Sequence, residues 1–387
     1  MRRLTTKHIQ FHILRAKDQA RRRKVWLLKK KRRAKRASIK EVAVFQDGKL
    51  TRSRSLVGIP MPEVVCLDDN PAETLKIIHQ INENILSRAM EFKRDQAAGR
   101  KRAPKTRTYF DFKPIKSIGP SAALVLAAIY QTSKSITGRR LQTIDEHQWD
   151  PNVVWTLRQL GFHELLEMKP YSQQNRYLSD VIIQRFVCGQ RADGAELGKL
   201  QEALALLLPD SLREKLLTAE PYGGMLEAIL NSYQWAYPED HKWGYDVLKN
   251  WWLTGAVDQT TNQVIVCVYD HGVSIPYSLP HWTQWNKAEL YAKKLMQRLK
   301  LSEPLDHYSN DGIAIRTAMK IANSATKLPQ HGKGLHTMVE VAKRARYGRL
   351  RILSRNGEYV WETGKSAKSF THPYPLQGTL VEWALEL

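Results

Sequence analysis

Cysteine is scarce in this 387-residue sequence, long apolar runs are absent, and acidic residues are few beside basic ones. The three cysteines, Cys66, Cys188 and Cys267, lie far apart without CxxC or Cys/His spacing, which argues against a disulfide framework or a structural zinc. The longest apolar stretch, around residues 122–130, is too short to span a bilayer, and the first residues lack the apolar core of a signal peptide. We therefore expect a cytoplasmic protein without a membrane span.

The shortage of acids leaves 61 Lys and Arg against 38 Asp and Glu, a formal net charge of +23. Residues 1–40 hold 17 basic residues and one acid, Asp18, so +16 of this charge is concentrated there. A block of this density binds polyanions through counterion release, and we expect it to bind nucleic acid. Docking on an acidic partner protein or membrane surface, or a merely solvated tail, are the alternatives. The candidate contacts are Arg21, Arg22, Arg23, Lys24, Lys29, Lys30, Lys31, Arg32 and Arg33.

Residues 41–169 alternate short strand patterns with helical ones. Asp47-Gly48 is a hairpin signal between two short strands. Apolar residues at helical spacing predict helices over 72–90, 121–132 and 150–160. Further short strands are expected at 63–67, 108–112, 141–144 and 165–167. This order predicts an α/β unit.

Two segments of this unit, FDFKPIKSIGPSAAL at 110–124 and residues 150–167, resemble the STAS domain, the α/β module of anti-sigma-factor antagonists. In that family a strand leads into an Asp-Ser-Ser-Gly turn at a helix start, where one serine accepts a phosphate. The corresponding stretch here is Gly119-Pro120-Ser121-Ala122, so the resemblance places Ser121 at the phosphoacceptor position. The residues themselves favour an ordinary helix N-cap at Ser121.

The second half of the chain carries residues suited to catalysis and phosphate binding. Helices are expected at 195–208, 222–237 and 288–299, and strands at 263–269, 349–354, 358–362 and 378–383, the second and third of these strands lying around Asn356-Gly357. Glu227 and Asn231 are four residues apart, which places both on one face of their helix. Asp270 ends a β-branched strand, and the glycines of 332–334 open a new helix. The tryptophans between residues 235 and 285 are expected to be core contacts.

These motifs in this order resemble the GHKL ATPase domain shared by histidine kinases and anti-sigma serine kinases, and residues 311–338 are most similar to the serine-kinase branch. The resemblance implies an α/β sandwich in which helices cover one face of a mixed sheet, with ATP and Mg²⁺ as cofactors. It implies that Asn231 holds Mg²⁺ and that Glu227 orients or deprotonates the nucleophile. Asp270 would accept the adenine amino group, Gly272 would leave room for the base, and Thr379 would assist through a water.

The same resemblance assigns the phosphates to the glycine turn. Gly332, Lys333 and Gly334 would present backbone N–H groups to the β- and γ-phosphates, and His331 would be a phosphate contact or a lid residue. Two positions depart from the family pattern. Trp235 stands where His or Asp is usual, and Ser274 replaces the second glycine of the Asp-x-Gly-x-Gly turn.

The sequence as a whole predicts α/β and α+β architecture in three parts: a basic arm at 1–40, helical or disordered, a STAS-like domain at 41–169 and a GHKL ATPase domain at 170–387. A lid over about 277–330 is expected to close on Mg·ATP. We expect an ATP-binding regulatory protein that hydrolyses ATP or phosphorylates a protein serine. The STAS-like domain is a candidate partner site, and a homodimer is left open. The alternative is a non-enzymatic nucleic-acid-binding module, or a phage-defence effector, in which ATP is only a conformational ligand.

Overall fold

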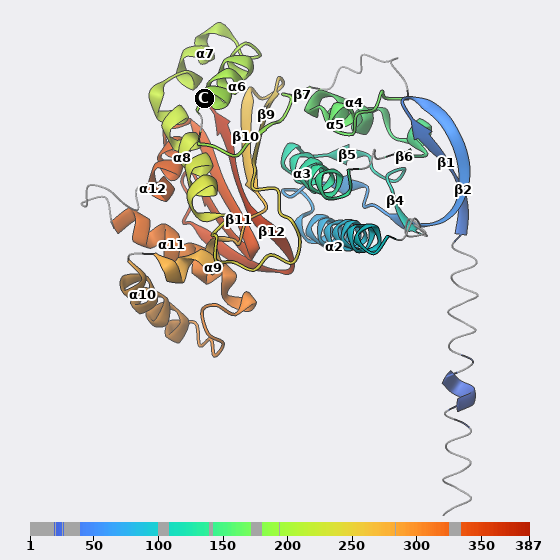
Figure 1. The fold of residues 1–387 in the computed structure, drawn as a ribbon. Helices are drawn as coiled ribbons and strands as arrows, with labels where there is room; N and C mark the ends of the chain where they lie inside the picture. The colour runs from blue at the N-terminus through green and yellow to red at the C-terminus, as the bar shows by residue number, and fades with distance from the viewer. Residues whose placement is uncertain are drawn as a thin grey trace, which may run out of the picture.

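The computed structural model describes residues 39–99, 108–138, 142–171, 180–192, 194–282, 284–324 and 334–387, together with 19, 21–24 and 26. These residues form a mixed α/β structure with a small sheet system in the N-terminal half and a large sheet in the C-terminal half (Figure 1). No helix in the described ranges is both long and apolar enough to cross a membrane.

The N-terminal half is built on the predicted hairpin. Strands β1 (Ile39–Gln46) and β2 (Lys49–Pro60) pair antiparallel around Asp47-Gly48, whose φ angles are +53° and +72°. Positive φ at both central residues gives a turn whose twist matches that of the strands. β2 also pairs parallel with β4, and β1 pairs antiparallel with β6. The remaining strands are β3 (Val64–Val65), β4 (Thr108–Asp111), β5 (Ser117–Ile118) and β6 (Thr143–Ile144).

Three long helices of this half appear where they were expected, and two details of the prediction are wrong. Residues 165–167 do not form a strand, because the chain after Gly161 continues as a short helix that ends in a turn. Ser121 is not an N-cap: Gly119 caps the helix, Pro120 is its first residue, and Ser121 is 3% exposed in the second position. The helices are α2 (Pro71–Ala97), α3 (Pro120–Thr137), η1 (Glu146–Gln148), α4 (Pro151–Leu160) and α5 (Phe162–Leu165).

The C-terminal half is organised around a six-stranded sheet in the order β11-β12-β10-β9-β7, with β8 also paired to β9. Every pairing described in this sheet is antiparallel, so the predicted mixed sheet is wrong. Its strands are β7 (Val181–Ile183), β8 (Val187–Gly189), β9 (Trp251–Asp258), β10 (Gln263–Asp270), β11 (Tyr347–Glu362) and β12 (Lys368–Glu386).

The two short strands predicted around Asn356-Gly357 are one continuous strand, β11, with a bulge between Ser354 and Gly357. At the bulge Arg355 has a φ of +54°. The carboxylate of Asp311 stabilises this irregular backbone, since it accepts from Arg355 Nε at 2.7 Å and from the Asn356 N–H at 2.9 Å. The carboxylate of Asp311, distant in the sequence, therefore stabilises the bulge at Arg355 and Asn356, where the local sequence predicts a turn.

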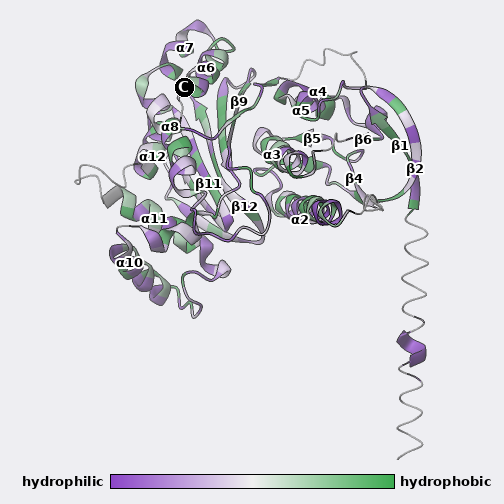
Figure 2. Ribbon diagram, in the orientation of Figure 1, coloured by the Kyte–Doolittle hydropathy of each residue, from purple (hydrophilic) through white to green (hydrophobic). Residues whose placement is uncertain are grey.

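Helices cover both faces of the six-stranded sheet, whereas the sequence predicted one covered face. Along β10, Val264, Val266 and Val268 pack against the C-terminal helices, while Cys267 and Tyr269 point to the other face and pack with α2 and α3. Figure 1 shows α8 and α12 on one side of this sheet and α2 and α3 on the other, and Figure 2 shows hydrophobic residues along its strands and the helices against it. The two halves thus share one core.

The C-terminal helices differ in what they contact. Helices α6, α8, α11 and α12 pack on the strands, whereas α7 packs on α6 and α10 packs on α11. The bounds are α6 (Ala195–Ala205), α7 (Asp210–Leu216), α8 (Ala219–Trp235), α9 (Ile275–Ser278), η2 (Leu279–His281), α10 (Trp285–Arg298), η3 (Tyr308–Asn310), α11 (Asp311–Ser324) and α12 (Gly334–Arg344).

Candidate functional site

A cavity of about 670 Å³ lies between α8, the start of α12 and the strands β10 and β12. Five residues singled out in the sequence line it: Glu227, Asn231, Asp270, Gly334 and Thr379. They come from four elements, since Glu227 and Asn231 share α8, and more than 150 residues separate the first from the last. The volume lies within the ~300–1,000 Å³ typical of small-molecule sites.

Strand register brings Asp270 and Thr379 together. Asp270 is the last residue of β10 and pairs directly with Thr379 of β12. Gly378, beside Thr379, has a φ of +84°, and a Cβ at this position would overlap the carbonyl oxygen of Asp270. Only glycine allows this approach of the two strands.

Asp270 is a buried carboxylate held by neutral donors. The hydroxyl of Ser232 donates to its Oδ2 at 3.0 Å and the N–H of Gly272 to its Oδ1 at 2.8 Å. Burial raises the pKa of Asp270 to about 6, although these hydrogen bonds act in the opposite direction. Near neutral pH the residue is therefore an ionised acceptor at the wall of the cavity.

Glu227 and Asn231 lie one turn apart on α8, as predicted, and face the start of α12. A Cβ on Gly334 would lie 2.5 Å from Glu227 Oε2 and 3.4 Å from Asn231 Nδ2, so the absence of a side chain permits the close approach. Burial raises the pKa of Glu227. The Nδ2 of Asn231 is buried without a hydrogen-bond partner in the described structure.

The first residue of α12 at the cavity is Gly334, and the first N–H groups of a helix have no partner within the helix. Such a helix start attracts anions. Gly332, Lys333 and His331, the other predicted phosphate contacts, lie outside the described residues, as do residues 325–330 of the predicted lid. The part of that lid that is described consists of α10, α11 and short helical turns.

Apolar side chains form the wall beside Asp270, and the sequence did not single them out. Val268, Ile275, Met338 and Val381 all line the cavity. No local motif marks them, because ordinary core positions of strands and helices carry the same residue types. The further polar or aromatic lining residues missed by the sequence analysis are Ser232, Gln234, Ser278, Trp282 and Gln284.

Gly272 lies outside the lining of this cavity. A Cβ on it would overlap the backbone oxygen of Ala236 at the end of α8, so its small size lets the turn after β10 pack on that helix. The idea that Gly272 leaves room for a base stays a prediction. The next residue in the family pattern, Ser274, lines the cavity at φ +82° and ψ 157°. Usually only glycine adopts these backbone angles. Ser274 therefore has the backbone conformation expected for a glycine at this position.

His271, between Asp270 and Gly272, ties the turn to the N-terminal half. Its Nδ1 lies 3.2 Å from Thr132 Oγ1 of α3, and its backbone N–H donates to the hydroxyl of Tyr237 at 2.9 Å. Complete burial lowers its pKa to about 3, so the ring is neutral. A metal role for this histidine has no support, since no group of three or more His, Cys, Asp or Glu in the described ranges could hold a metal ion.

The residues of the cavity fit a magnesium nucleotide better than a free metal. Mg²⁺ is usually held by one or two protein ligands together with substrate phosphates and water, and the carboxamide of Asn231 offers one such oxygen. Within the part of the chain that the structure describes, the Nδ2 of the same side chain has no hydrogen-bond partner, which leaves a donor for a ligand.

The basic arm is described only at a few positions. Arg21, Arg22, Arg23 and Lys24 have helical backbone and exposed side chains. The predicted contacts Lys29, Lys30, Lys31, Arg32 and Arg33 lie outside the described residues.

Comparisons with known proteins identify no relative of this chain. No protein-family model, curated protein or solved structure matches the chain. What the cavity binds is therefore inferred from its residues.

Proposed function

We propose that the 670 Å³ cavity binds Mg·ATP and that the chain is an ATP-binding regulatory protein of the GHKL type. The observation that carries the proposal is the meeting of Glu227, Asn231, Asp270, Gly334 and Thr379 around one cavity. These five residues lie on four elements that are far apart in the sequence, and chance would rarely bring all five to one cavity.

The Asp270 end of the cavity suits adenine. An ionised carboxylate accepts a hydrogen bond from the exocyclic amino group of adenine, whereas guanine presents an oxygen at that position and would be repelled. Val268 and Val381 supply an apolar wall for a flat ring, and Thr379 stands opposite Asp270. The site should therefore prefer ATP to GTP.

The Glu227 end of the cavity suits the phosphates. The start of α12 lies at this end of the cavity, and a helix start favours anions. The Asn231 oxygen would bind Mg²⁺, which when bound neutralises phosphate charge. Glu227 lies beside both, and its raised pKa brings it closer to that of an effective general base. Glu227 would orient and deprotonate a water molecule or a serine hydroxyl of a partner protein.

The proposal is tested by thermal shift with Mg·ATP, Mg·GTP and no nucleotide. A ligand at a hundred times its Kd adds about 2.7 kcal/mol to the free energy of unfolding, and we expect this gain with ATP alone. Asp270→Asn should abolish it, because the carboxamide has no negative charge and places an NH₂ donor where the carboxylate has a second acceptor oxygen. Asp258→Asn, at the opposite end of the same sheet, is the matched control. Equal stabilisation by ATP and GTP, or none, would refute the proposal.

A second measurement separates an enzyme from a ligand-gated binding module. If the chain hydrolyses ATP, Glu227→Gln should abolish phosphate release while the ATP-induced stabilisation remains. If ATP is only a conformational ligand, the wild type releases no phosphate. In that case salt-dependent nucleic-acid binding should persist in Glu227→Gln and disappear when residues 1–40 are deleted, because this segment carries +16 of the net charge.

A further inference from the structure

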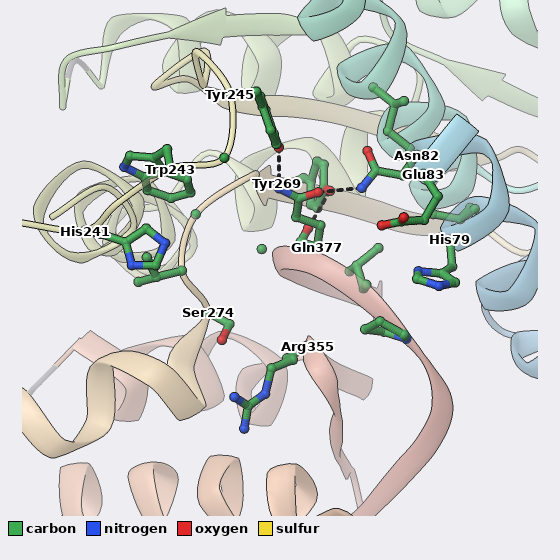
Figure 3. Close-up of a pocket in the computed structure, with 18 residues that line it drawn as sticks. His79, Asn82, Glu83, His241, Trp243, Tyr245, Tyr269, Ser274, Arg355 and Gln377 are labelled. Carbon is green, nitrogen blue, oxygen red and sulfur yellow. Dashed lines mark hydrogen bonds between the residues drawn. The ribbon is translucent and has the colours of Figure 1, made fainter. Parts of the chain in front are cut away.

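A second cavity, of about 350 Å³, lies where α2 of the N-terminal half meets the large sheet. Its other wall is the loop between α8 and β9, which contributes His241, Trp243 and Tyr245 (Figure 3). Ser274 lines this cavity and the first one, so the turn after Asp270 separates the two. The volume equals roughly that of twelve water molecules in the liquid, which suits a small organic molecule.

Among the polar groups at this cavity, an amide acceptor and an indole donor lack hydrogen-bond partners in the described ranges. Asn82 donates through Nδ2 to Gln377 Oε1, and Gln377 donates through Nε2 to the hydroxyl of Tyr245, as the dashed lines of Figure 3 show. Asn82 is 6% exposed, and its Oδ1 has no hydrogen-bond partner in the described ranges. The donor is Nε1 of Trp243, and both atoms are buried from water, so the charge of the cavity rather than these two atoms selects the ligand.

The charge at this cavity is negative, in contrast to the chain as a whole. Glu83 extends its carboxylate from α2 toward the cavity (Figure 3), and no cation of the described structure pairs with it. Arg355 also lies at the edge, but its guanidinium turns toward Asp311 and binds it at 2.7 Å. Its charge is therefore already neutralised.

We propose that this second cavity binds a small organic cation that carries an amine or guanidinium group. Such a group donates several hydrogen bonds, accepts none and carries the charge opposite to that of Glu83. The aromatic rings of Trp243 and Tyr245 add cation–π attraction. A flat neutral heterocycle would use the rings but would leave the Glu83 carboxylate without a counter-charge.

The second cavity also has a direct route to the first. The turn from Asp270 to Ser274 is the shared wall, and the cation would contact it from the side opposite the nucleotide. Ligands that bias one element from two sides change each other's affinity by the same factor, typically about 5- to 150-fold. This coupling, unlike the cation site itself, rests on the proposed ATP function.

The test is calorimetric titration of the full chain, without nucleotide, with butylguanidinium and with butylurea, its neutral isostere. We expect butylguanidinium to bind at least tenfold more tightly and Glu83→Gln to abolish the difference. Glu91→Gln, on the same helix outside the cavity, should retain it. Gly244→Leu should block both ligands, since a Cβ there meets open space at the cavity wall. A Gly-Arg-Gly peptide distinguishes a protein side chain from a free cation as the source.

Equal affinities for the two isosteres, unchanged binding in Glu83→Gln, or no binding of either cation would overturn the proposal. Displacement of butylguanidinium by adenosine in Asp270→Asn, in which the first cavity should no longer bind adenine, would also overturn it and assign a heterocycle pocket instead. The circular dichroism spectrum and thermal unfolding midpoint of Glu83→Gln should match the wild type, because Glu83 is exposed. These titrations contain no ATP, so they stand even if Mg·ATP fails to bind the first cavity.

Discussion

Replacing Ser274 by glycine should stabilise the protein, although most substitutions at buried positions destabilise. Ser274 has a φ of +82° and a ψ of 157°, a conformation that has a free-energy cost of about 1–3 kcal/mol for any residue except glycine. Its hydroxyl is also buried without a partner in the described ranges, which costs about 1–3 kcal/mol more. Glycine removes both terms and loses only about 0.5–1 kcal/mol through the greater freedom of the unfolded chain. We expect a net gain of about 1–5 kcal/mol.

The gain is measurable by urea unfolding monitored through tryptophan fluorescence. Ser278→Gly is the matched control, because Ser278 lines the same cavity but has a helical φ of −77° and donates to the carbonyl of Ile275 at 3.2 Å. Ser278→Gly should lower the free energy of unfolding by about 1 kcal/mol. If Ser274→Gly destabilises the protein as Ser278→Gly does, the strain described at Ser274 is absent and the reasoning fails.

Three further results are expected. The folded-state pKa of Asp270 is about 6 against an ordinary value of 3.8, so the folded state retains the proton to higher pH. The Asp270 contribution to the free energy of unfolding should therefore fall by up to about 3 kcal/mol between pH 4 and 6.5. Urea unfolding across pH measures this fall, and Asp270→Asn should make it smaller by that amount. Gly378→Ala should lower the free energy of unfolding by at least about 3 kcal/mol, because the new Cβ would clash with Asp270. Gly364→Ala is the control: Gly364 has a φ of +75° and nothing near its Cβ, so this change should cost only about 1–2 kcal/mol. Equal losses of stability in thermal unfolding would contradict the clash. Gly334→Ala should displace Glu227 and weaken Mg·ATP binding about tenfold by calorimetry, while Gly223→Ala, with open space at its Cβ, leaves affinity unchanged.

Local sequence patterns predicted the elements that carry the first cavity. The helical spacing around Glu227 and Asn231 and the β-branched residues before Asp270 depend on neighbours along the chain, and α8 and β10 appear where expected. The resemblance to a known family then supplied the expectation that these residues meet. The structure brings five of them to one cavity.

What the sequence did not predict depends on contacts between distant residues. Trp251 and Trp252 are buried as expected, whereas Trp235 is 44% exposed, so the expectation of core tryptophans is wrong there. The strand β9 was missed because it is buried along nearly its whole length and lacks the alternation of a half-buried strand. The bulge in β11 depends on Asp311, more than 40 residues earlier. The alternation of residues along β10 does not predict that Tyr269 packs against the N-terminal half. The sequence therefore predicted neither the second covered face of the sheet nor the 350 Å³ cavity between this face and α2.

The packing of α2 and α3 on the large sheet has a consequence for folding during synthesis, because these helices precede the strands that they cover. The strands β9 to β12 leave the ribosome after α2 and α3, and one of their faces carries Trp252, Tyr269 and Leu380, all at most 1% exposed once folded. The helices that cover this face are made first and are already present when the strands emerge. A C-terminal half expressed alone would present that apolar face to solvent and aggregate, whereas co-expression of the two halves as separate polypeptides should restore a soluble complex.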